Sequence, residues 1–207
     1  MINQEKDGSI KKKTGWENVP QFIERSKEHL ASIPKFSLFE APIRNTLPCK
    51  TINLMDLFFL IRNDFKEQTA ALRACTSKEE SRKIKANRFS YVTFSGIFSS
   101  RKDEGLIKHS GLLCLDFDHL KDVKVTRELL LDDPYFQTEM LFISPSGDGL
   151  KWVIKINLEE DNHLNWFLAI SNYLKRTYKL EPDKAGKDIS RACFLPNDPK
   201  LYLNPRY

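Results

Sequence analysis

Short apolar runs that alternate with amphipathic stretches fill the sequence from residue 91 onward, and they limit the possible folds more than any other feature. Their length and composition predict β-strands over 91–94, 111–117, 139–144, 150–156 and 192–195. Apolar residues at helical spacing predict helices over 126–131 and 164–178. Strands mixed with helices in this way indicate an α/β or α+β core.

The chain before residue 91 has a different texture. Residues 1–16 are polar and rich in lysine, which predicts a flexible tail. Residues 17–90 predict a mainly helical part that packs on a core domain of residues 91–207. Its expected elements are a short strand over 36–39 and helices over 20–31, over 54–65 behind an N-cap at Asn53, and after Ser77, where Glu80 completes a capping box.

Basic residues are concentrated in one segment of a chain whose formal net charge is +5. Residues 62–88 contain eight basic and four acidic side chains. Such a segment suits a nucleic-acid backbone, but charge runs of this kind are more often a solvated helix face. The candidate nucleic-acid-binding residues within it are Arg82, Lys83, Lys85 and Arg88.

The four cysteines are spaced without a Cys-x-x-Cys pair, which argues against a disulfide framework and against a zinc site. The N-terminal sequence is polar, and no segment has the length and apolarity of a membrane span. We therefore expect the cytoplasm as the compartment and no membrane among the partners.

Two carboxylates end a predicted strand whose apolar residues indicate burial. Asp116 and Asp118 stand two residues apart after Gly111-Leu-Leu-Cys-Leu, so a strand directs both to one face. Carboxylate oxygens at this spacing can bind Mg²⁺ or Mn²⁺. The alternative is a strand that ends in an ordinary polar turn.

A glycine-containing loop joins the next two predicted strands. Ser144-Pro-Ser-Gly-Asp-Gly-Leu-Lys151 places glycines at 147 and 149, which allow positive φ angles and an anion-binding nest of N–H groups. Ser144, Ser146 and Lys151 add polar and cationic side chains that suit triphosphate oxygens. The alternative is an ordinary hairpin turn, for which Gly-Asp-Gly is common chemistry.

A third polar segment precedes the last predicted strand. Asp183 or Asp188 can complete a metal site with the two earlier aspartates. Arg191 can bind a phosphate or pair with an aspartate, and the sequence leaves both readings open.

In their order and type, these three elements resemble the motifs of the archaeo-eukaryotic primase superfamily: a strand ending in Asp-x-Asp, a Ser-Gly-x-Gly-x-His type loop, and a lone Asp ahead of a strand. The sequence looks most similar to the N-terminal domain of virulence-associated E proteins, a primase-polymerase-like module of bacterial mobile elements. The segments that carry this resemblance, within residues 35–205, are 93–98, 109–112, 144–147 and 188–191.

The resemblance implies an α+β fold with a mixed sheet flanked by helices. It also implies nucleotidyl transfer by a two-metal mechanism in the replication of a mobile element or plasmid. Asp116, Asp118 and Asp183 would bind Mg²⁺ or Mn²⁺, with Asp188 as the reserve ligand. The nucleotide would be held by Ser144, Ser146, Gly147, Gly149, Lys151 and Arg191. The implied partners are a nucleoside triphosphate, a DNA or RNA template, and a helicase-like domain or protein.

Two departures from the superfamily pattern keep other functions open. Lys151 stands where many primase-polymerases have histidine, and the sequence ends soon after the third motif without a P-loop. Both favour a catalytically inactive nucleic-acid-binding replication module, in a fragment or in one half of a split system. A metal-dependent nuclease, which uses similar carboxylates to activate water, is the third hypothesis.

Overall fold

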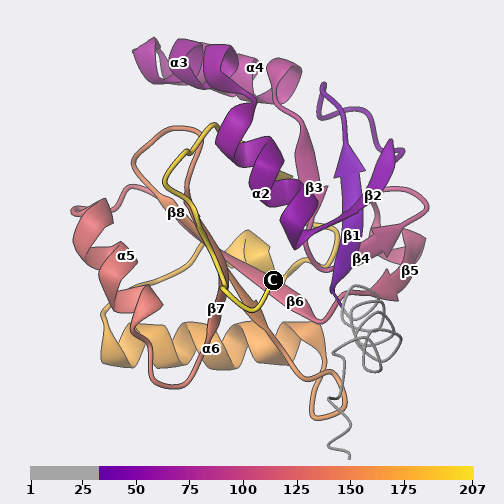
Figure 1. Ribbon diagram of the computed structural model, residues 1–207, viewed down its shortest axis with the longest axis vertical. Helices are drawn as coiled ribbons and strands as arrows, with labels where there is room; N and C mark the ends of the chain where they lie inside the picture. Colours follow the sequence, from indigo (N-terminus) through magenta and orange to yellow (C-terminus); the bar gives the residue numbers. More distant parts are fainter. Residues whose placement is uncertain (1–32) are drawn as a thin grey trace, which may run out of the picture. The chain divides into compact units, whose positions relative to one another are not determined.

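Antiparallel sheets organise the computed structural model, which describes residues 33–207 (Figure 1). The first sheet has the strand order β2-β1-β3-β9. Its strands are β1 (Lys35–Phe39), β2 (Lys50–Asn53), β3 (Tyr91–Thr93) and β9 (Cys193–Phe194). The predicted domain boundary at residue 90 falls inside this sheet, because β1 before it pairs with β3 after it. Residues 34–207 form one compact unit.

The second sheet carries the longest strands and has the order β10-β7-β8-β6. Its strands are β6 (Leu112–Phe117), β7 (Thr138–Ile143), β8 (Leu150–Lys155) and β10 (Tyr202–Leu203). A separate hairpin pairs β4 (Gly96–Phe98) with β5 (Leu106–His109).

Five α-helices and two short 3-10 helices complete the described residues. The α-helices are α2 (Leu54–Asn63), α3 (Lys66–Ala74), α4 (Lys78–Arg88), α5 (Val123–Leu131) and α6 (His163–Thr177). The 3-10 helices are η2 (Asp103–Gly105) and η3 (Lys184–Lys187). In Figure 1, α5 and α6 lie along one face of the second sheet and α2 lies on its other side. None of these helices has the length and apolarity to cross a bilayer.

The second sheet is buried on both faces, which is why its strands read as nearly continuous apolar runs. Trp152 and Ile154 of β8 pack in the cluster that includes α5 and α6 residues. Val153, between them, packs instead in the cluster that includes α2 and the first sheet. By the same alternation, Asp116 of β6 and Lys151 of β8 lie on the α2 side, among apolar neighbours.

The α+β class predicted from the sequence is confirmed, but the expected mixed sheet is not found among the described strands. Every hydrogen-bonded pair is antiparallel. The reason is the position of β8: β6 and β7 are joined through α5 and run in the same direction, yet β8 lies between them and pairs with both.

Several predicted element boundaries are correct and others are not. Asn53 caps α2 through a full capping box, and Ser77 caps α4 by accepting from the Glu80 N–H. The predicted helix over 54–65 ends earlier, because Phe65 adopts a left-handed conformation and α3 begins after it. β2 was not predicted. The expected tail over 1–16 and helix over 20–31 lie outside the described residues.

Packing of α6 against the second sheet can be tested with two leucines of the same helix. Leu174 is fully buried, whereas Leu168 is 47% exposed. We expect Leu174→Ala to lower the free energy of unfolding by about 2 to 5 kcal/mol, and Leu168→Ala to change it by no more than about 0.5 kcal/mol. Urea denaturation measures both values. Equal losses in the two variants would contradict this placement of the helix.

Candidate functional site

Three carboxylates meet where β6 ends. Asp116 and Asp118 leave β6 on the same side, as the strand alternation predicted. Asp183 comes from the segment before η3, and its backbone N–H donates to the Asp116 carbonyl at 2.7 Å. One ligand oxygen from each of the three lies within 4.8 Å of the others. Sequence reasoning therefore named three residues that the fold brings together.

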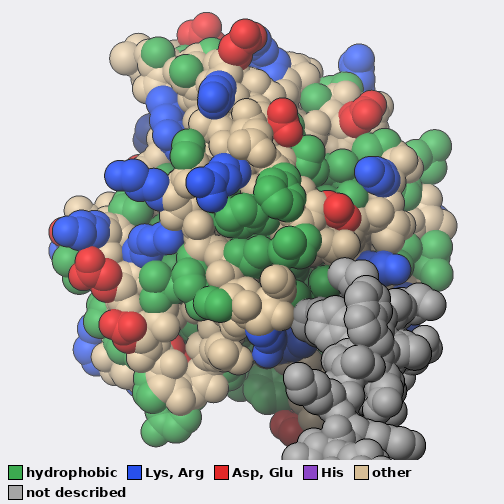
Figure 2. All heavy atoms as spheres, viewed as in Figure 1, with side chains coloured by type: hydrophobic (Ala, Val, Ile, Leu, Met, Phe, Trp, Pro, Cys, Tyr) green, Lys and Arg blue, Asp and Glu red, His purple; other side chains and the backbone are tan. Residues whose placement is uncertain are grey.

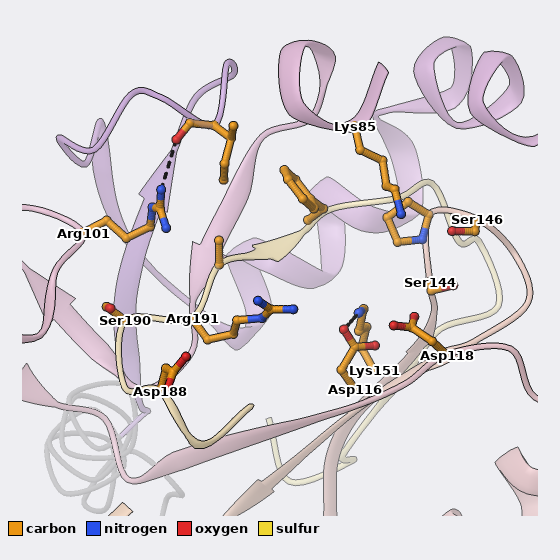
Figure 3. Close-up of a pocket in the computed structure, with 14 residues that line it drawn as sticks. Lys85, Arg101, Asp116, Asp118, Ser144, Ser146, Lys151, Asp188, Ser190 and Arg191 are labelled. Atoms are coloured by element: carbon orange, nitrogen blue, oxygen red, sulfur yellow. Dashed lines mark hydrogen bonds and ion pairs between the residues drawn. The ribbon is translucent and has the colours of Figure 1, made fainter. Parts of the chain in front are cut away.

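A pocket of about 350 Å³ opens beside these carboxylates (Figure 3). Ten polar or charged side chains and four apolar ones line it, so its chemistry suits a charged ligand. The lining residues are Ile43, Lys85, Arg101, Asp116, Asp118, Ser144, Pro145, Ser146, Lys151, Asp188, Ser190, Arg191, Ala192 and Phe194.

Asp116 forms a buried ion pair with Lys151, the residue directly opposite it in the β6–β8 register. Burial raises the pKa of the Asp116 carboxyl, although Lys151 acts in the other direction. Burial is the largest single influence on the pKa of Lys151 and lowers it, but the charge and hydrogen bond of Asp116, together with Cys193 and Cys114, outweigh burial and raise the pKa above its usual value. The second Asp116 oxygen, Oδ1, is buried and has no hydrogen-bond partner among the described residues.

Asp183 is paired as well. Its Oδ2 accepts from the Arg191 guanidinium at 2.8 Å, and its Oδ1 accepts from the Ala185 N–H at 3.1 Å. Of the two readings that the sequence left open for Arg191, the structure shows the ion pair with an aspartate. Asp188, the reserve ligand, lines the pocket beside Arg191 and is not part of the three-carboxylate group.

The glycine loop is a tight hairpin turn between β7 and β8. Gly147 has φ +89°, and its N–H donates to the Ser144 carbonyl at 2.9 Å, so this N–H is not free to bind a phosphate. A side chain at Gly149 would press on the Phe117 carbonyl. Neither glycine lines the pocket, whereas Ser144 and Ser146 do. The two glycines that the sequence assigned to nucleotide binding thus serve the turn.

Arg73 of α3 holds this loop from outside, and sequence reasoning missed it. Its Nε donates to the Pro145 carbonyl at 3.2 Å and its Nη2 to the Ser144 carbonyl at 3.4 Å. The arginine had counted only as part of the basic segment. Arg73 is separated from Ser144 and Pro145 by 71 and 72 positions in the chain, so only the fold reveals that they are in contact.

The basic segment itself is divided by the fold. Lys85 lines the pocket, whereas Arg82 and Arg88 are exposed on α4 and Lys83 pairs with Glu79 at 2.7 Å. On the face drawn in Figure 2, Lys and Arg side chains are interspersed with acidic and apolar groups. Arg101, also in the pocket, donates to the Tyr91 hydroxyl and the Ile43 carbonyl.

Two histidines fix the segment that follows Asp183. His109 contacts His163 at 3.1 Å, and the far nitrogen of His163 contacts the Gly186 carbonyl of η3 at 3.3 Å. The remaining nitrogen of His109 accepts from the Gly111 N–H at 3.0 Å. Burial lowers the pKa of both rings, that of His109 to about 4. These contacts could not be predicted from the sequence, because the two histidines are 54 residues apart.

Removing the cation of the buried pair should destabilise the protein. Lys151→Met leaves Asp116 as a buried charge without its partner, and we expect a loss of about 3 to 5 kcal/mol of unfolding free energy. The matched control is Lys155→Met on the same strand, because Lys155 is exposed and should cost no more than about 0.5 kcal/mol. Urea denaturation of both variants measures the difference. A tolerated Lys151→Met would show that the pair contributes nothing to the fold.

The histidine contacts predict a pH dependence of stability. Because the folded-state pKa of His109 lies near 4, below the usual 6.5, the unfolded chain binds more protons between these values. The free energy of unfolding should therefore fall as pH is lowered through this range. His109→Asn should reduce the slope of unfolding free energy against pH, measured by urea denaturation. An unchanged slope would exclude His109 as a contributor.

Comparison with known proteins places the chain in a family. A family model described as "BT4734-like, N-terminal domain" matches residues 83–203, more than half of the chain, including every candidate site residue from Asp116 to Arg191. Searches of curated proteins and of solved structures found no match.

The family match corrects the resemblance drawn from the sequence. The N-terminal domain of virulence-associated E proteins is a different family, so that assignment is wrong. Its motifs span only a few residues each, and a strand ending in Asp-x-Asp or a Gly-x-Gly turn occurs in many families. The chain belongs to the family of BT4734-like N-terminal domains.

Proposed function

We propose that this domain binds a nucleoside triphosphate with Mg²⁺ or Mn²⁺ and transfers a nucleotidyl group to a nucleic-acid end, as primase-polymerases do. The observation that carries the proposal is the meeting of three carboxylates with Lys151 and Arg191 at one pocket. A metal–triphosphate complex needs both kinds of group, since its cations bind carboxylates and its phosphates bind lysine and arginine.

The carboxylate group suits hard divalent cations. Asp116, Asp118 and Asp183 offer oxygens within 4.8 Å of one another, a span compatible with two metals about 3.5 to 4 Å apart. The unpartnered Oδ1 of Asp116 supports a ligand at this point, because buried polar atoms usually have a partner. Bound metals would lower the pKa of the attacking hydroxyl and stabilise the pyrophosphate leaving group.

Side chains, rather than the glycine backbone, would hold the phosphates. Lys151 and Arg191 supply the charges and Ser144 and Ser146 the hydroxyls on the pocket wall. Lys85 of α4 also lines the pocket and adds positive charge next to the exposed face of α4, where a DNA or RNA strand would bind. A helicase-like partner and a mobile-element setting stay predictions. The cytoplasm also stays the expected compartment, since the four cysteines are free thiols.

One observation favours a second candidate, the catalytically inactive nucleic-acid-binding module. Clustered carboxylates are costly without a neighbouring cation, but here Lys151 and Arg191 already neutralise two of the three. The cluster can therefore persist without a metal, so its presence alone does not require catalysis. Metal binding and turnover separate the two candidates.

The proposed metal site predicts that Mn²⁺ binding depends on the β6 carboxylates. We expect calorimetric titration to detect Mn²⁺ binding to the wild type and little or none to the Asp116→Asn, Asp118→Asn double variant. With Mn²⁺ or Mg²⁺ present, the wild type should incorporate labelled nucleotide into a primed template and the double variant should not.

The other outcomes identify the alternatives. Equal Mn²⁺ binding by both proteins would remove the metal site. Metal binding without incorporation would favour the inactive module, and cleavage of the template would favour a nuclease.

The basic segment predicts salt-dependent nucleic-acid binding. Reversing Arg82, Lys83 and Lys85 to Glu should weaken DNA affinity and lower the slope of log affinity against log salt by up to about three, because fewer counterions are released. The matched control reverses three exposed basic residues at the end of α6, Lys175, Arg176 and Lys179. If both triple variants lose the same slope, α4 is an ordinary solvated face.

A further inference from the structure

Both cations beside the three-carboxylate group are bonded to the carboxylates that a metal would use. Lys151 pairs with Asp116, and Arg191 pairs with Asp183 at 2.8 Å. Asp118 is exposed and has no ion pair within residues 33–207. A divalent cation entering the group must therefore overcome repulsion from two neighbouring cations that already occupy carboxylate oxygens.

Resting on the proposed function, we propose that Lys151 and Arg191 exchange partners during binding. They would leave the carboxylates when divalent cations arrive and bond instead to the phosphates of a nucleoside triphosphate. Metal and triphosphate would then bind cooperatively. The metals would pair with the carboxylates that Lys151 and Arg191 leave, and the phosphates would pair with the two side chains that the metals release. The ion pairs would thus weaken the binding of either ligand alone without abolishing it.

The charges around the pocket support coupled entry. Its four basic side chains, at 85, 101, 151 and 191, are balanced by four carboxylates when Asp183 is counted with the three that line the pocket. Metal alone would leave this partly buried site strongly positive, and triphosphate alone would leave it strongly negative. Two divalent cations and one triphosphate together nearly cancel, so joint binding avoids the cost of an unbalanced charge at low dielectric.

The side chains that would exchange are placed to do so. Lys151 and Arg191 both line the pocket, so a ligand bound there would lie beside both side chains (Figure 3). Ser144 also lines this pocket. It is 2% exposed, and its hydroxyl has no hydrogen-bond partner among the described residues. This hydroxyl points to a ligand independently of the carboxylates, and a phosphate oxygen would satisfy it.

The test is Mn²⁺ affinity without nucleotide, measured by calorimetry on the full chain at neutral pH. Removing either competing cation should tighten Mn²⁺ binding, so we expect Lys151→Met and Arg191→Met each to bind Mn²⁺ at least about tenfold more tightly than the wild type. The matched control is Arg101→Met. It removes one positive charge from the same pocket, but Arg101 bonds to Tyr91 and Ile43 rather than to a carboxylate.

A reciprocal measurement uses a non-hydrolysable nucleoside triphosphate in the presence of a chelator. Asp116→Asn should bind this nucleotide more tightly than the wild type does, because Lys151 is released for the phosphates. The matched control, Asp188→Asn, removes a carboxylate that lines the pocket but lies outside the three-carboxylate group.

The outcomes separate this inference from the proposed function. Tighter Mn²⁺ binding by the Lys151 or Arg191 variant, but not by Arg101→Met, supports the exchange. Unchanged or weaker binding by folded variants overturns it while leaving the metal site in place. Mn²⁺ binding that survives loss of Asp116 and Asp118 overturns both. If thermal melting shows that Lys151→Met does not fold, the half-exposed Arg191 decides the matter, since its replacement leaves the core intact.

Discussion

The buried pair of Asp116 and Lys151 is the interaction on which the site depends. The two residues are direct cross-strand neighbours in β6 and β8, the strands that pack on both faces. A slip of one residue in this register would turn one of the two charges into the apolar layer beneath α5 and α6 and leave its partner without an ion pair. The backbone of Asp116 also accepts from the Asp183 N–H, so the same position that sets the register anchors the third carboxylate.

Stability alone does not explain why two charges occupy this position. Removing both from water costs several kcal/mol, and an apolar pair of similar volume is often as stable or more so. The three buried positions that follow Lys151 in β8, Trp152 to Ile154, all hold apolar residues. The exception stands at the end of the strand that faces the pocket, where the proposed binding of a metal and a triphosphate would use both charges.

The sequence predicted those parts of the site that local periodicity controls. Strand alternation put Asp116 and Asp118 on one face, and capping chemistry located the starts of α2 and α4. Contacts between distant segments could not be predicted from the sequence. The ion pair of Lys151 depends on the β6–β8 register, and the hydrogen bonds from Arg73 to the loop depend on where α3 packs. β2 was not predicted because its four residues include only one buried apolar side chain, Ile52.

The hairpin between β7 and β8 determines which groups could bind phosphate in the proposed function. A backbone nest presents free N–H groups at fixed positions, so it can bind phosphate whether or not a metal is present. Here the Gly147 N–H is used within the turn, and the positive charge comes from Lys151 and Arg191. Side-chain cations can be paired and released, whereas backbone dipoles cannot. Under the proposed exchange, such a pocket would gain affinity for phosphate only when a metal takes the carboxylates.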